Sequence, residues 1–427
     1  MKKFAPLALA ATIAAVSASP ASAVDIKMDG EQVCQFQTAS IGFSGKNDEF
    51  IGHRTRIGMA MVANASLSGY LQFQVGEDLW GTAIDGNGTQ AENNIYARQM
   101  YLDWAIPGTE AKVRMGRHEF SMPAYVFCSP IIAYHVAEGV VIDLPLAESF
   151  DLTGFWTRAA SNIAEGEGKG RDFDVFGLVG KVSLDRVDAS PWLVYGSKDA
   201  GVTGDYLQST VQSEAPADML ILGGGLRWKA FDPFTLELDA AWGKVSYDSG
   251  EEQDDKGWYV AAGCSYALNF AVPALKAWYA SGDEAGERFQ SGHLPNIFGD
   301  NDASNMFFDG APGIIGGNRT NIGGTWGVSA RLNGLSFVEN LTHDLSVTYI
   351  SGTNDKANVG EGYGIGYEYL TSKDSALEFA AVNTFKMYKE LSVFLEAAYI
   401  VEDYDTASRG RDFENDWRLS MTFMYTF

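Results

Sequence analysis

The feature that most constrains the fold is an almost unbroken period-two alternation at the carboxyl end of the chain. One set of alternate side chains in residues 417–427 is apolar and rich in aromatic rings: Trp417, Leu419, Met421, Phe423, Tyr425 and Phe427. The intervening set is polar, with Met424 as the exception: Arg418, Ser420, Thr422 and Thr426. Successive side chains of an extended strand face opposite sides. The pattern therefore predicts a terminal strand whose aromatic face is covered by the hydrocarbon of a membrane.

The same alternation recurs along the chain, in residues 67–75, 234–242 and 391–399. Segments of about ten residues with an apolar outward set and a polar inward set are typical of transmembrane β-strands. Each segment alone is weak, so the repetition carries the argument. Beyond the amino terminus, the sequence contains no apolar run near the roughly 20 residues of a spanning helix. We therefore predict an all-β fold, a transmembrane antiparallel β-barrel in which every backbone group is paired.

The amino terminus predicts export. Lys2 and Lys3 form a positive start, residues 4–16 are apolar, and Ala21-Ser22-Ala23 is a small-residue cleavage site, which together indicate a signal peptide over residues 1–23. Residues 24–427 then form one barrel domain. Without the two lysines the chain carries 29 basic and 55 acidic side chains, a net charge of −26. An exported barrel is expected in the outer membrane of a Gram-negative cell.

The spacing of the segments predicts the number of strands. Short connectors occur at residues 64–66, 107–109, 145–148, 185–188, 231–233, 270–273 and 388–390. Longer polar stretches occur at residues 44–52, 76–93, 118–136, 158–172, 197–217, 247–257, 281–324, 352–374 and 402–415. Tight periplasmic turns that alternate with long extracellular loops are typical of these barrels. Nine long loops, the eighth containing residues 362–370, predict 18 strands. Sixteen is an open alternative, because the patterns at 136–158 and 172–196 are ambiguous.

Several classes of function find no support in the sequence. The chain contains no HExxH, CxxC, GxSxG or P-loop motif, and its five histidines lack ligand spacing, so we expect no enzyme, cofactor or metal site. The strong acidity argues against a nucleic-acid partner. Cys34, Cys128 and Cys264 are too few for a disulfide framework. Three unpaired thiols are the favoured interpretation, and one disulfide with one free thiol stays open.

The phase of the strands predicts which charges face the interior. In residues 54–61 and 111–115, the apolar alternate positions are assigned to the lipid, which turns the basic positions inward. The last strand must pair with the first, so its basic residue joins the same arc of the wall. The predicted pore-lining cations are Arg54, Arg56, Lys112, Arg114 and Arg418.

Two of the long loops have unusual compositions. Residues 118–136 are apolar and aromatic with two prolines, so this loop should be buried. It either folds inward and narrows the pore, with Glu119 as an acidic partner of the wall arginines, or packs against a neighbouring subunit; we favour the first. Residues 281–324 contain clustered acidic side chains: Asp283, Glu284, Glu287, Asp300, Asp302 and Asp309. We expect this loop to be a solvated cap, with solute or divalent-ion binding as the alternative.

Several segments together resemble the general diffusion porins of Gram-negative outer membranes. They are the signal peptide, Val113-Arg-Met-Gly-Arg-His118 before a long third loop, Asn94 to Pro107 ending in Tyr101-Leu-Asp-Trp-Ala-Ile-Pro107, and the terminal Phe427. The segment Leu370-Thr-Ser-Lys-Asp-Ser-Ala-Leu-Glu378 is similar to one in the homotrimeric porins of sulfate-reducing bacteria. The resemblance implies a homotrimer, a third loop bent into the lumen, and a terminal aromatic residue read by the barrel-assembly machinery. The acidic loop tip of enteric porins is missing here.

These observations favour an outer-membrane porin that passes ions and small hydrophilic solutes passively, in contact with outer-membrane lipid and lipopolysaccharide. A substrate-selective channel for organic acids or sugars is the first alternative, because inward arginines could bind anions in sequence. An outer-membrane hydrolase and a surface adhesin are less favoured. The sign of any ion preference is open, since most of the acidic charge lies in loops whose fields are screened beyond about 8 Å.

Overall fold

The computed structural model describes residues 24–40, 47–80, 95–162, 171–202, 215–248, 254–287, 290–308, 310–314, 319, 321–358, 369–405 and 413–427. The predicted signal peptide, residues 1–23, lies outside the described residues, as do Asp309 and most of segment 362–370. Within the described ranges, no helix has the length and apolar composition needed to cross a membrane.

Eighteen β-strands and one 3-10 turn make up the secondary structure of the described chain. The strands are β1 (Asp25–Ser40), β2 (Asn47–Asn64), β3 (Leu67–Leu79), β4 (Ile95–Ala105), β5 (Lys112–Phe120), β6 (His135–Ala147), β7 (Phe150–Asn162), β8 (Arg171–Ser183), β9 (Val187–Lys198), β10 (Ala217–Phe231), β11 (Phe234–Tyr247), β12 (Asp255–Tyr266), β13 (Val272–Ala280), β14 (Thr325–Val338), β15 (Leu341–Gly352), β16 (Ser375–Lys386), β17 (Leu391–Asp403) and β18 (Asp416–Thr426). The 3-10 turn η2 (Lys356–Asn358) lies between β15 and β16.

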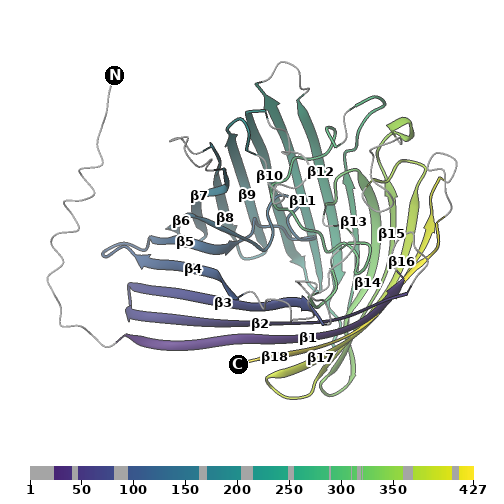
Figure 1. Cartoon of the computed structure of the whole chain (residues 1–427), viewed down its shortest axis with the longest axis horizontal. Helices are drawn as coiled ribbons and strands as arrows, with labels where there is room; N and C mark the ends of the chain where they lie inside the picture. Colours follow the sequence, from purple (N-terminus) through teal and green to yellow (C-terminus); the bar gives the residue numbers. More distant parts are fainter. Residues whose placement is uncertain are drawn as a thin grey trace, which may run out of the picture.

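The strands form one closed antiparallel ring (Figure 1). Each strand pairs with its neighbours in sequence, and β1 closes the ring by pairing with β18, for example Gln35 with Thr422 and Ala39 with Arg418. The predicted barrel of 18 strands is therefore confirmed, and the alternative of 16 is wrong. Closure leaves no unpaired edge, which is what a sheet in contact with lipid requires.

The turns alternate with the loops as predicted, with one addition. All seven predicted short connectors lie between consecutive strands, and nine longer connections separate the resulting hairpins. The sequence pattern missed an eighth short turn, Glu339-Asn340, between β14 and β15. Asn340 has φ = 63°, a left-handed conformation that asparagine tolerates better than most residues.

The outward face of the barrel is apolar between two belts of aromatic side chains. One belt includes exposed rings toward the long-loop rim: Phe176, Tyr195, Trp242, Trp258, Tyr279, Phe379 and Tyr399. The other lies near the short turns: Trp228, Phe231, Phe234, Phe270, Phe385 and Tyr425. Phe234 and Trp242, on one strand, are separated by about 27 Å of extended chain. A strand tilt of about 40° reduces this to about 20 Å along the barrel axis, comparable with the apolar band of about 25 Å in outer-membrane barrels.

Candidate functional site

The predicted lumen cations lie on one arc of the wall, but most of them are paired with carboxylates. Arg54 and Arg56 of β2 share Glu31 of β1, with guanidinium-to-carboxylate distances of 2.9 Å and 3.2 Å. The Arg56 Nε also donates a hydrogen bond to Gln74 of β3 at 2.8 Å. The side chains of Arg54, Arg56 and Glu31 are 11%, 20% and 21% exposed. This part of the wall therefore presents two guanidinium groups that share one carboxylate.

Arg114 and Lys112 follow the predicted inward phase of β5, with different surroundings. Arg114 donates two hydrogen bonds to the carboxylate of Asp103 on β4, at 2.7 Å and 2.8 Å, and its guanidinium lies 4.1 Å from the ring centre of Tyr101. Lys112 is exposed and has no hydrogen-bond or ion-pair partner among the residues that the structure describes. Both line a cavity of about 440 Å³ together with Asp143 of β6. Lys112 is thus a free positive charge beside a carboxylate.

Arg418 occupies a buried position on the inner side of β18. It donates hydrogen bonds from Nη2 to Glu396 of β17 at 2.9 Å and to the carbonyl oxygen of Asn305 at 2.7 Å. The Arg418 and Glu396 side chains are 0% and 1% exposed. Arg418 therefore supports a loop inside the barrel and is not a freely accessible pore charge.

Glu119 pairs with a different arginine from those predicted. Its carboxylate forms an ion pair with Arg98 of β4 and contacts none of Arg54, Arg56 or Arg114 within hydrogen-bond distance. Arg98 also donates to Gln72, at a bulge where β4 carries an extra residue opposite β3. Alternation alone could not place Arg98, because the bulge shifts the phase of the strand.

The connection between β5 and β6 folds into the barrel, as the sequence favoured. The backbone N–H groups of Tyr125 and Val126 donate to the carboxylate of Asp239 on β11, at 3.0 Å and 2.6 Å. Lys276 of β13 donates to the carbonyl oxygen of Val126. The ring of Phe127 packs edge-on against Trp278 of β13, at 5.6 Å between centres. A loop that starts at β5 thus reaches the inner wall at β11 and β13.

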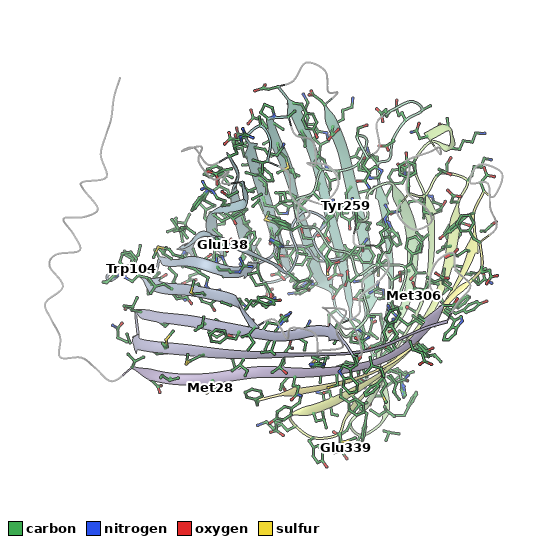
Figure 2. All side chains as sticks on the ribbon, viewed as in Figure 1. Met28, Trp104, Glu138, Tyr259, Met306 and Glu339 are labelled. Carbon is green, nitrogen blue, oxygen red and sulfur yellow. The ribbon has the colours of Figure 1, made fainter. Side chains whose placement is uncertain are left out.

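The connection between β13 and β14 is also buried inside the barrel, so the prediction of a solvated cap is wrong for this segment. Met306, Phe307 and Phe308 are fully buried (Met306 is marked in Figure 2). The backbone N–H groups of residues 305, 306 and 307 all donate to Glu378 of β16, at 2.6, 3.2 and 2.7 Å. Apolar residues flank the acidic ones that suggested a cap, and burial of Met306, Phe307 and Phe308 favours the inward position. Asp283 is also buried, whereas Glu284 stays exposed.

The two inward loops are joined to each other. Ile132 and Phe298 form a parallel β-bridge, and the N–H of Ala133 donates to the carbonyl oxygen of Phe298 at 2.9 Å. The backbone N–H of Cys128 donates to Asp302 at 2.8 Å, and burial raises the pKa of the Cys128 thiol to about 12. Cys34, Cys128 and Cys264 are all unpaired, as favoured. The loops therefore form one internal partition, which narrows the lumen.

A second buried cluster ties the extracellular parts of two loops together. His293, in the β13–β14 loop, is fully buried and hydrogen-bonded through Nε2 to Asn354 at 2.8 Å. Asn354 lies just after β15 and also accepts from the backbone N–H of Asp283 at 2.8 Å. Burial lowers the pKa of His293 below its usual value. The described residues contain no group of three or more side chains suited to hold a metal ion.

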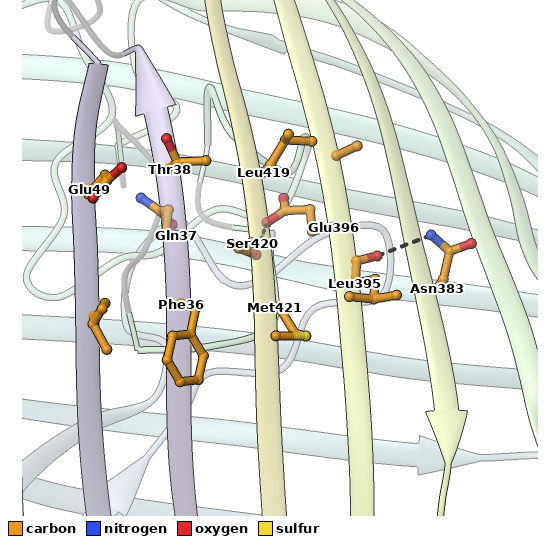
Figure 3. A pocket seen from close by; sticks show the side chains of 12 residues that line it. Phe36, Gln37, Thr38, Glu49, Asn383, Leu395, Glu396, Leu419, Ser420 and Met421 are labelled. Carbon is orange, nitrogen blue, oxygen red and sulfur yellow. Dashed lines mark hydrogen bonds between the residues drawn. The ribbon is translucent and has the colours of Figure 1, made fainter.

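The outer face carries an apolar groove of about 520 Å³, shown in Figure 3. It crosses β16, β17, β18, β1 and β2, and its walls include Phe36, Leu395, Leu419 and Met421. These residues belong to the outward set of their strands, because the residues that follow Leu395 and Leu419 in the chain, Glu396 and Ser420, are buried inside. The groove is therefore part of the lipid-facing surface and not of the pore.

The carboxylate partners were the part of the site that sequence reasoning missed. Glu31, Asp103, Glu378 and Glu396 each pair with a lumen arginine or a loop backbone. Their positions in the polar set of alternating residues could have placed these carboxylates on the inner face of the barrel. Which cation each one meets depends on cross-strand register, and alternation does not determine that register.

Comparisons with known proteins found likeness in structure only. No family model matches the chain, and no curated protein matches it. Among solved structures, it is similar to Pseudomonas aeruginosa OpdQ, with 14% identity and a TM-score of 0.56 over 94% of this chain and 98% of that one. P. aeruginosa OpdK with vanillate has 11% identity and a TM-score of 0.57 over 94% and 98%. P. aeruginosa OprD has 13% identity and a TM-score of 0.56 over 96% and 97%. At these identities the likeness shows the barrel fold.

Proposed function

We propose that this chain is an outer-membrane porin through which ions and small hydrophilic solutes diffuse passively. The observation that carries the proposal is the closed ring with an apolar outer face, charged and polar groups on part of its inner wall, and two loops folded into the lumen. An apolar belt between aromatic girdles suits a lipid bilayer. Cavities of about 440 and 380 Å³, each lined by both polar and apolar side chains, remain on the inner wall beside the loops. This combination suits passage of water-soluble molecules.

A substrate-selective channel for organic acids is the second candidate. Lys112 has no partner among the described residues and shares its cavity with Arg114, so a carboxylate passing this wall would meet one free and one paired cation. The similar OpdK structure was determined with vanillate. Sugars, the other solutes suggested by the sequence, would depend on neutral polar groups instead. A hydrolase or an adhesin draws no support from the site's geometry.

Reconstitution in planar bilayers tests the proposal. The purified protein should be β-rich by circular dichroism and should give stepwise ion conductance that rises with salt concentration. Conductance that saturates or is blocked by carboxylates, but not by neutral solutes of the same size, would favour the selective channel. A helical spectrum, or a folded barrel that passes no ions, would refute both candidates.

The remaining expectations concern the assembly and the partners. A homotrimer, as in the porins of sulfate-reducing bacteria that the sequence resembles, is proposed together with contact to outer-membrane lipid and lipopolysaccharide. Phe427 is proposed as the signal read by the barrel-assembly machinery. Its backbone N–H and C=O exchange hydrogen bonds with Gly30 of β1, at 3.1 Å and 3.0 Å, and its side chain is half-exposed. A terminal ring held at the closing seam of the barrel fits that role.

A further inference from the structure

We propose that the inner wall below the β13–β14 loop contains a binding subsite for a neutral monosaccharide. The inference rests on the proposed channel function and specifies a solute class for one part of its lumen. The subsite is the cavity of about 380 Å³ between loop residues 305 and 310–312 and the inner faces of β14, β15, β16 and β17. It lies on the opposite wall from the charged cavity that contains Lys112.

The cavity belongs to the lumen, because its wall residues share the inward phase. Thr384 of β16 pairs in register with Phe394 of β17, and Phe394 pairs with Thr422 of β18, which is fully buried inside. Ser346 of β15 pairs with Arg331 of β14, whose guanidinium donates to the carbonyl oxygens of residues 302 and 303 in the loop. The wall and the loop are therefore held together around the cavity.

The cavity offers a solute both apolar surface and neutral polar groups. Asn333 and Thr384 have no hydrogen-bond partner among the residues that the structure describes, and both are partly exposed. Ser346 donates only a long hydrogen bond, 3.4 Å, to Asn305. An amide and two hydroxyls can each donate and accept, which matches the paired hydroxyl groups of a sugar. The ring of Phe394 adds an apolar surface for the C–H face of such a ring.

Charge and size narrow the choice further. The two ionised groups of the cavity, Arg331 and Asp344, have opposite signs, and each already has partners: loop carbonyl oxygens for Arg331 and the N–H of Gly334 for Asp344, at 2.6 Å. Because these two charges are opposite, the cavity has no net charge that would favour an anion or a cation. The volume of about 380 Å³ lies at the small end of the range of about 300–1,000 Å³ for small-molecule sites. A neutral monosaccharide satisfies both conditions.

Glucose titration of the reconstituted full-length protein tests the subsite, with Asn333→Ala and Thr384→Val as separate variants. Wild-type ion conductance should fall with glucose in a saturable way, and calorimetry on the detergent-solubilised protein should give the same half-saturating concentration. Each variant should raise that concentration about threefold to tenfold, the usual effect of one lost hydrogen bond. Thr342→Val is the matched control, since Thr342 faces Thr384 across the strands but does not line the cavity.

The outcomes separate this subsite from the channel itself. Two results would overturn the subsite and leave the porin proposal standing, provided that ion conductance is normal. In the first, the effect of glucose on conductance is linear and does not saturate. In the second, the half-saturating glucose concentration is the same in both variants as in the wild type. A folded protein without ion conductance would overturn both. Gluconate serves as the anionic comparator. If gluconate half-saturates at a lower concentration than glucose, and this depends on Asn333 and Thr384, the proposal that the subsite binds a neutral sugar is contradicted.

Discussion

The support of the inward β13–β14 loop by Glu378 can be tested by a change that keeps the shape of the side chain. Glu378→Gln removes the negative charge from a fully buried carboxylate that accepts hydrogen bonds from three successive backbone N–H groups. The two carboxylate oxygens divide these donors between them. Glutamine has only one carbonyl oxygen, so at least one donor of the loop would lose its partner.

The expected cost follows from those three contacts. A hydrogen bond to a charged group contributes about 1.5–3 kcal/mol, and a neutral one about 1 kcal/mol. Losing one bond and weakening two should therefore reduce the free energy of loop closure by about 2.5–7 kcal/mol, a factor of about 70 to 100,000 in the closed-to-open ratio. The barrel itself should persist, because the ladder of β16 with β15 and β17 does not depend on this side chain.

Hydrogen exchange and single-channel recording read out the change. The amides of residues 305–307 should exchange faster in Glu378→Gln by about the same factor, and the open-channel current should become noisier or larger. Glu390→Gln, in the exposed turn between β16 and β17, is the control that removes one negative charge without touching the loop. Unchanged protection of these three amides in Glu378→Gln would refute the idea that this carboxylate holds the loop.

Three further predictions follow from single side chains. Arg114→Ala should leave Asp103 unpaired and shift the reversal potential in a salt gradient toward cation preference; an unchanged potential and conductance would remove Arg114 from the ion path. Burial lowers the pKa of His293, so an opened loop binds a proton more readily than the native one, and loop protection should decline as pH falls below about 6.5. That decline should be absent in His293→Asn, as judged by hydrogen exchange. Phe427→Ala should reduce the amount of assembled protein in outer membranes, measured by heat-modifiable mobility; normal amounts would exclude a role in assembly.

The strand ring was predictable because it rests on a local rule. Side-chain alternation, turn residues and the parity of strands all repeat many times along the chain, so errors in one segment do not change the architecture. The turn at Glu339-Asn340 was missed without consequence for the count, because the long loops on either side already required it. The outward aromatic belts follow from the same period.

The interior was harder to predict, because it depends on contacts between distant segments. Glu378 receives donors from residues more than 70 positions earlier, and Asp239 receives them from residues more than 110 positions earlier. A loop rich in Asp and Gly is typical of a solvated surface, yet three consecutive apolar residues, 306–308, decide its place. Composition averaged over the whole loop concealed them. The inward β5–β6 loop was recognised because its apolar character extends over its whole length.

Ion preference in this channel should depend on unpaired charges, and the total charge is a poor guide to it. The net charge of −24 suggests cation preference, and the predicted arc of five cations suggests the opposite. In the structure, Arg114 and Arg418 each lie within about 3 Å of a carboxylate oxygen, so each of these two pairs acts as a dipole whose field falls off within a few ångströms. Arg54 and Arg56 share the carboxylate of Glu31. Lys112 is the member of the arc with no partner in the described chain, and Asp143 lies opposite it in register on β6. One free cation beside one carboxylate can produce only weak preference, screened beyond about 8 Å at physiological salt.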